Sequence, residues 1–202
     1  MTPLVFKFAK RVNNESEDMV LFKAKKSTVQ LHLTLWHLFA AVGLWYVIRG
    51  KPWTPWFMGG DGDFVNGFVN MPFSPLDTDG YYFGLILLGH PLQESISHFF
   101  IKEKEPEFYE MALHHLAHLS LASCYMYSNV IPVGSLIAFV HDASDVPGCL
   151  CKFFHLSGYD VPWAAVALMT TQVLWFYGRL LCLPMLMKEL YRLNYGPGRE
   201  HL

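Results

Sequence analysis

Residues 111–141 read MALHHLAHLSLASCYMYSNVIPVGSLIAFVH, and this stretch of 31 residues contains no Asp, Glu, Lys or Arg. A helix crosses the hydrocarbon core of a bilayer with roughly 20 apolar residues, so the stretch is too long for one crossing. Asn129 and Pro132 lie near its middle, and both residue types interrupt helices. The sequence therefore predicts a helical hairpin within a membrane, with one helix near 108–129 and a shorter one near 132–146.

Three further apolar runs predict helices near 28–48, 80–101 and 161–187. Hydrophobic residues make up 52% of the chain and charged residues only 16%, whereas soluble domains are about 25% charged. A chain with so few charged residues has too little polar surface to cover a globule in water. We therefore expect an all-α fold, an integral membrane helical bundle with about five transmembrane helices. The net charge of -2 provides no basic surface for nucleic acid.

The uncharged runs divide the chain into three parts. A polar N-terminal segment spans 1–27, the transmembrane domain spans 28–190, and a polar tail spans 191–202. Lys and Arg are more frequent in the N-terminal segment and in the loops expected on the same side of the membrane. This bias predicts that the N-terminus lies on the inner side.

Histidines and aspartates lie inside the predicted hairpin. His114 and His115 stand near the start of its first helix, and His141, Asp142 and Asp145 near the end of its second. His115 and Asp145 are each 15 residues from residue 130, ~22 Å along a helix. Because the two helices are antiparallel, we expect His114 or His115 within hydrogen-bond reach of one of the other three residues, directly or through one water.

Ionisable groups inside a membrane are costly and usually functional. A histidine beside a carboxylate suits general-base or nucleophilic chemistry, since the carboxylate orients the ring and stabilises its cationic form. A structural alternative is that these groups cap helix ends and pair with one another. A second alternative is a metal site built on His114, His115 and His118, with His141 and the aspartates as further ligands. We expect no metal.

Other ionisable residues in the apolar runs have simpler interpretations. Single histidines on different helices are expected to form interhelical hydrogen bonds; they are His32, His37, His90, His98 and His155. Arg179 lies late in the last predicted helix, and we expect its long side chain to reach toward the membrane surface.

At the hairpin the sequence resembles the TLC-domain family, and within it the ceramide synthases. The resemblance rests on EMALHH at 110–115 followed by HDASD at 141–145, with His141 standing 26 positions after His115. It extends over roughly 25–190 and includes further landmarks of the family: KPW at 51–53, Tyr81-Tyr82, and Arg179 with Pro184.

The resemblance implies a helical barrel around a lipid tunnel in the endoplasmic reticulum membrane. It implies an enzyme that joins the acyl group of acyl-CoA to the amine of a sphingoid base. The family's catalytic residues correspond to His114, His115, Asp142 and Asp145, and spacing adds His141. Acyl-CoA would be the co-substrate, with no covalently bound cofactor.

A second hypothesis is a catalytically degenerate TLC-fold subunit that binds lipid or builds a large membrane complex, in another organelle membrane. Pro132 stands where the family pattern has arginine, and by comparison with that pattern we expect the family's first and last helices to be missing. We therefore expect an incomplete barrel, with membrane lipids and other membrane subunits covering the helix at 28–48 or at 161–187. A third hypothesis is another membrane lipid enzyme, including a metal-dependent one.

Overall fold

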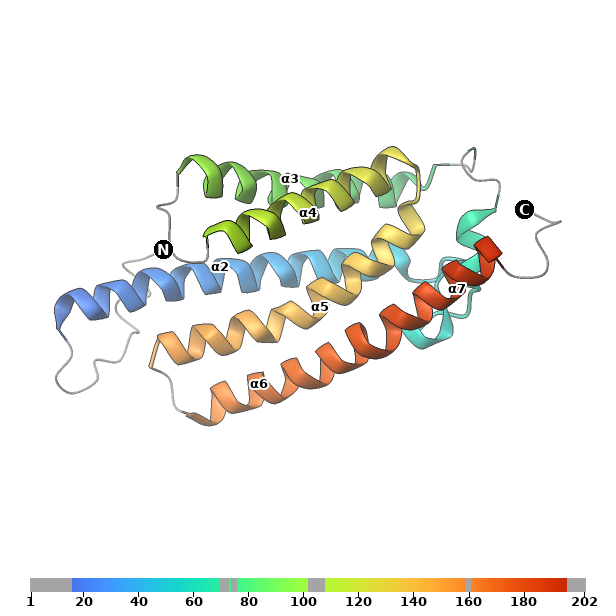
Figure 1. Cartoon of the computed structure of the whole chain (residues 1–202). Helices are drawn as coiled ribbons and strands as arrows, with labels where there is room; N and C mark the ends of the chain where they lie inside the picture. Colours follow the sequence, from blue (N-terminus) through green and yellow to red (C-terminus); the bar gives the residue numbers. More distant parts are fainter. Residues whose placement is uncertain (1–15, 70–72, 74–75, 102–107, 159–160, 196–202) are drawn as a thin grey trace. The chain divides into compact units, whose positions relative to one another are not determined.

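The structure is a computed structural model that describes residues 16–69, 73, 76–101, 108–158 and 161–195. Its main helices are α2 (Glu17–Ile48), α3 (Thr78–Phe100), α4 (Phe108–Tyr127), α5 (Ile131–Leu156), α6 (Val161–Trp175) and α7 (Leu183–Tyr195), with a π-helix η3 (Phe176–Cys182) joining the last two. No β-strand occurs in these residues (Figure 1). The predicted all-α fold is confirmed, and each of the five predicted helices has a counterpart.

The predicted division of the hairpin segment into two helices is confirmed: α4 ends at Tyr127 and α5 begins at Ile131. The long uncharged run breaks after Tyr127, and Asn129 adopts a left-handed backbone conformation with φ of 55°. Asn tolerates this conformation better than most residues, which is why the chain turns there. The prediction that 111–141 is not one unbroken helix is therefore correct.

Helix α2 begins at Glu17, well before the predicted start at Thr28. Glu17 and Asp18 occupy its first turn, where negative charge interacts favourably with the helix dipole. The Ser16 hydroxyl accepts a hydrogen bond from the backbone N–H of Met19, at 3.3 Å. An apolar run marks the part of a helix that suits a bilayer, and a helix can continue beyond it.

The predicted end of the second hairpin helix at residue 146 is wrong. Helix α5 continues through Pro147 and Gly148 to Leu156. A proline removes one backbone N–H and thus one helical hydrogen bond, and membrane helices tolerate this loss because neighbouring groups satisfy the freed carbonyl. Likewise Pro91 lies inside α3, which is continuous from Thr78 to Phe100.

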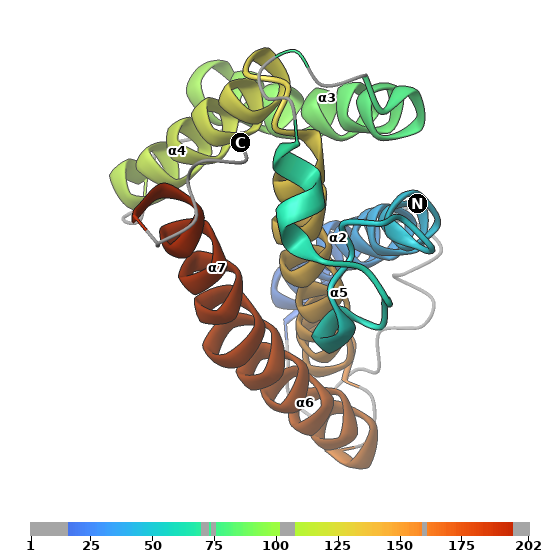
Figure 2. The same cartoon turned by 90° about the vertical axis from the view of Figure 1, so that its right-hand side faces the viewer.

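Two stretches of the described chain are long and apolar enough to cross a membrane. They are α2 and the continuous helix over Val161–Arg192, each of 32 residues. Figure 2 shows α6 and η3 following one another as one helix. Large apolar side chains on both stretches are exposed, among them Phe39, Tyr46, Val166 and Met169. Such surfaces suit contact with lipid.

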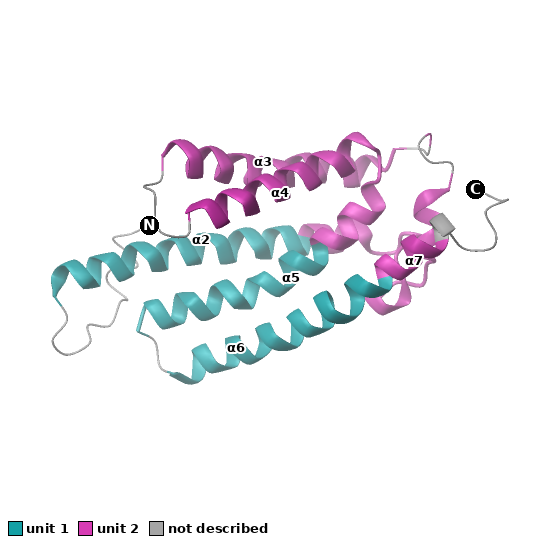
Figure 3. Ribbon diagram, in the orientation of Figure 1, with its two compact units in different colours: residues 1–42, 139–185 teal, residues 43–138, 186–202 magenta. Residues whose placement is uncertain are grey.

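The chain divides into two compact units (Figure 3). Unit 1 comprises residues 1–42 and 139–185, and unit 2 comprises 43–138 and 186–202. In unit 1, α5 contacts α2 through a hydrogen bond between the hydroxyls of Ser27 and Ser157, both buried. On another side it contacts α6, where the Cys151 thiol donates to the carbonyl of Ala164 at 3.4 Å.

Unit 2 is built on α3 and α4, which pack side by side (Figure 1). The connection before α3 carries two short 3₁₀ helices, η1 (Trp56–Met58) and η2 (Phe64–Phe68). It buries Trp53, Phe57 and Phe64. Lys51 Nζ donates to Asp77 Oδ1 at 2.8 Å, and this ion pair ties the connection to the start of α3.

Candidate functional site

Helix α5 presents Asp142 to α2 within unit 1. Asp142 Oδ1 lies 2.7 Å from Nδ1 of His37. The side chains of Asp142 and His37 are 18% and 19% exposed, respectively. The pair is therefore mostly buried, and part of each side chain remains accessible. When the carboxylate is ionised, Nδ1–H is the donor, and this contact fixes the ring so that Nε2 is the accepting nitrogen.

Asp145 lies one turn further along α5 and has a different partner. Arg179 Nη2 donates to Asp145 Oδ1 at 2.6 Å. Arg179 belongs to the π-helix η3, and short π-helical segments frequently occur at functional sites. The extension of Arg179 toward the membrane surface stays a prediction, and within unit 1 its guanidinium is paired with a carboxylate, as a cation in an apolar bundle requires.

Close packing brings η3 to α5. A Cβ atom added at Gly178 would lie 2.8 Å from Cγ1 of Val140, which no real Cβ contact allows. Gly178 therefore permits an approach that a larger residue would prevent. The next residue is Arg179, so this approach places its guanidinium beside Asp145.

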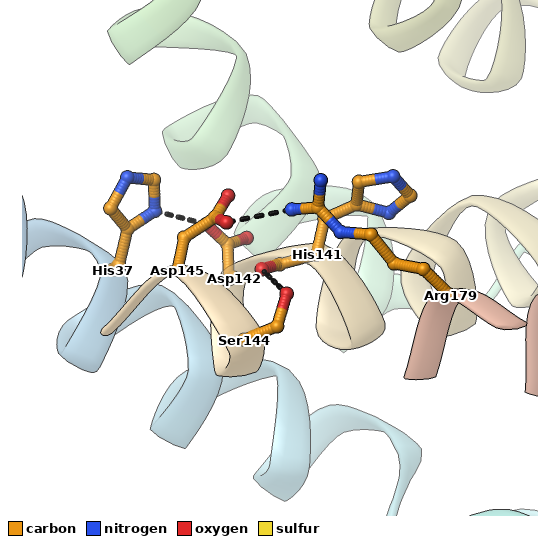
Figure 4. A network of polar contacts seen from close by, with 6 residues as sticks. All are labelled: His37, His141, Asp142, Ser144, Asp145 and Arg179. Atoms are coloured by element: carbon orange, nitrogen blue, oxygen red, sulfur yellow. Dashed lines mark hydrogen bonds and ion pairs between the residues drawn. The ribbon is translucent and has the colours of Figure 1, made fainter. Parts of the chain in front are cut away.

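Figure 4 shows the resulting network around α5. His37 and Arg179 reach the two aspartates from opposite sides, one from α2 and the other from η3. Asp142 and Asp145 are three residues apart, which separates them by about 60° around a helix. Each carboxylate thus has its own basic partner. The Ser144 hydroxyl donates to the backbone carbonyl of His141 at 2.9 Å.

The paired histidines lie on α4 in unit 2. His115 is 8% exposed, whereas His114 is exposed, because neighbouring helical residues point about 100° apart. The His115 ring centroid lies 5.1 Å from that of His98 on α3. His98 stacks on Phe108 at 4.5 Å, and its Nε2 lies 2.9 Å from the Phe108 carbonyl oxygen.

The histidines expected to join helices do so at two positions. His37 links α2 to α5, and His98 links α3 to α4. The proximity of His114 or His115 to Asp142, Asp145 or His141 stays a prediction, because the two sets belong to different units.

Sequence reasoning did not place His37 and Arg179 in the site. The signal for Arg179 was present, since a guanidinium within an apolar helix calls for an anionic partner. His37 carried no such signal, because it lies 105 residues from Asp142 in the chain and only tertiary packing pairs them.

The metal-site alternative rests on His114, His115 and His118. The ring centroids of His114 and His118 are 6.2 Å apart. Within the described ranges, no group of three or more His, Cys, Asp or Glu residues is placed to hold a metal ion.

The fold and the site define a class of protein. It is an all-helical membrane protein in which α4 carries two adjacent histidines and α5 carries two aspartates, each in contact with a basic side chain. The family model of the TLC domain matches residues 26–200, and the chain belongs to this family. It is ceramide synthase-like: human ceramide synthase 5 is 35% identical to it over 100 residues, which cover 50% of this chain and 24% of the human protein. Mouse ceramide synthase 5 is 31% identical over 100 residues, covering 50% and 23%.

The matched segment thus represents about a quarter of the length of these curated relatives. No solved structure shows significant similarity to the chain.

Proposed function

We propose that this chain transfers the acyl group of a fatty acyl-CoA to the amine of a sphingoid base. One observation carries the proposal: on α5 the HDASD sequence holds two aspartates, each in a close contact with a basic side chain, at 2.7 Å and 2.6 Å. In a membrane bundle two carboxylates so close together are costly unless each is paired. The similarity to proteins named ceramide synthase 5 supports this chemistry.

The reaction joins the amine nitrogen to the thioester carbonyl carbon and releases CoA. It requires a group that accepts either the acyl chain or the amine proton, and an imidazole does both. We assign this role to the pair His114 and His115. His114 is the exposed member, so its ring is open to a ligand, while the buried His115 packs against His98.

We propose further that the protein acts in the endoplasmic reticulum membrane, with acyl-CoA as co-substrate. The acyl-CoA head group is polar and highly charged, so it would approach from the inner side, where the N-terminus is expected.

The test is an acyl-transfer assay on the purified chain in phospholipid vesicles. Isotope-labelled acyl-CoA and a sphingoid base are supplied, and the N-acylated product is measured by mass spectrometry. We expect product from the native chain and none from the double variant His114→Ala, His115→Ala, with unchanged helical content by circular dichroism. Full turnover in the double variant would disprove the role of the pair. An inactive native chain, beside an active ceramide synthase, would reject the activity.

The surface of α6 supports a second candidate function, a lipid-binding or architectural subunit. Large apolar side chains surround this helix and are mostly exposed: Val161, Trp163, Val166, Met169 and Val173 are 60–78% exposed. In a membrane such a surface contacts lipid tails or a neighbouring subunit. Native mass spectrometry of the chain extracted in mild detergent tests this candidate. Partner subunits in fixed stoichiometry, together with no acyl transfer, would favour it over the enzyme.

A further inference from the structure

The two aspartates of α5 differ in the kind of basic partner that each one has. Arg179, beside Asp145, carries a guanidinium that keeps its charge under all conditions in which the protein is folded. His37, beside Asp142, carries an imidazole that is charged only when it is protonated. Of these two pairs, the pair of His37 and Asp142 is therefore the one that can exist with or without the proton.

We propose that His37 is a further catalytic residue, which accepts the proton that the substrate amine loses during acyl transfer, and that Asp142 orients it. This inference rests on the proposed function. It assigns a proton acceptor on α2, outside the EMALHH and HDASD sequences of α4 and α5.

The geometry suits that role. The contact of 2.7 Å between His37 Nδ1 and Asp142 Oδ1 holds the ring and directs Nε2 away from the carboxylate (Figure 4). A carboxylate in this position fixes the tautomer and stabilises the imidazolium that forms when Nε2 takes a proton. Both side chains are partly buried. Burial strengthens the attraction between the imidazolium and the carboxylate, since charges interact more strongly where the effective dielectric constant is low.

The chemical step balances as follows. An imidazole of the pair His114 and His115 first takes the acyl group from the thioester: the C–S bond breaks, and CoA leaves as the thiol with the proton of that ring. The neutral amine nitrogen of a long-chain base then attacks the acyl carbon, so that the new C–N bond forms and the bond between the acyl carbon and the imidazole nitrogen breaks. The amine nitrogen loses one proton to Nε2 of His37. That proton is then released to the imidazole nitrogen that left, so that the products are the amide, CoA thiol and neutral histidines.

The first test replaces His37 by glutamine. The glutamine amide still donates a hydrogen bond to Asp142 but accepts no proton near neutral pH. We expect kcat to fall by about 10²–10⁴-fold, the usual contribution of a general base, while KM and the thermal unfolding midpoint stay close to native. The matched control is His155→Gln, which changes an exposed histidine near the end of α5 and should keep the native kcat.

The second test separates a base from a residue that merely fills space. In His37→Ala, added imidazole should restore turnover, and added pyrazole should not. The two rings have nearly the same size and shape, and pyrazole is far too weak a base to accept the proton. Equal restoration by both compounds would show that His37 only packs there, which overturns the proposal.

The two proposals fail in different ways. A native chain that forms no amide overturns the proposed function, and this inference with it. An active native chain together with a fully active His37→Gln variant overturns the inference alone.

Discussion

At the scale of single residues, the contact between Arg179 and Asp145 tests how strongly the bundle depends on balanced charge. Arg179→Met keeps an apolar stem of similar length and leaves Asp145 without the guanidinium that now lies 2.6 Å away. Removing one partner of a fully buried ion pair costs about 3–5 kcal/mol. These side chains are 26% and 40% exposed, so we expect a smaller loss of unfolding free energy, about 1–3 kcal/mol.

The double variant Arg179→Met, Asp145→Asn is the control. It also removes the unpaired negative charge of Asp145. Its stability in detergent should therefore recover toward the native value, as a double-mutant cycle would measure. A single variant with native stability would show that the pair contributes nothing to the fold.

At the scale of elements, the approach of η3 to α5 depends on one glycine. Gly178→Ala places a methyl group 2.8 Å from Val140 Cγ1. The helices must separate or Val140 must shift, and overpacking of this kind costs about 1–3 kcal/mol. We expect a lower midpoint of thermal unfolding, recovered in part by adding Val140→Ala.

Gly89 provides the matched control for that prediction. It also lies inside a helix, α3, and a Cβ atom added there would meet nothing within 4 Å. Gly89→Ala should be neutral or stabilising, by up to ~1 kcal/mol, because alanine has the higher helix propensity. If the two glycine variants lose equal stability, the close approach at Gly178 has no special importance.

At the scale of the whole molecule, the distribution of Lys and Arg predicts which end of α2 lies inside. Lys23, Lys25 and Lys26 occupy its early turns, whereas only Arg49 and Lys51 follow its end closely. An epitope tag placed before Met1 should be removed by protease added to intact microsomes, whose outer face is the cytoplasmic face. A protected tag would reverse the orientation. It would also place the proposed entry of acyl-CoA on the other side.

The sequence alone determined the class of fold and most helix positions. Uncharged runs longer than a bilayer crossing require helices, because a backbone in lipid must satisfy its own hydrogen bonds. Asn129 and Pro132 located the turn of the hairpin for the same local reason. Pro147 misled the prediction of the end of α5, since the cost of a proline in a helix depends on its neighbours, which a local pattern does not contain.

Only the tertiary structure decided how the polar residues pair. The motif HDASD identified Asp142 and Asp145 as functional candidates, and the spacing suggested His114 and His115 as their partners. In the structure Asp142 contacts His37 from α2, and Asp145 contacts Arg179 from η3. Residues 105 and 34 positions away in sequence meet through helix packing, which depends on side-chain shape at many positions together. Gly178 is one such position, and no spacing rule within a single helix encodes its contact with Val140.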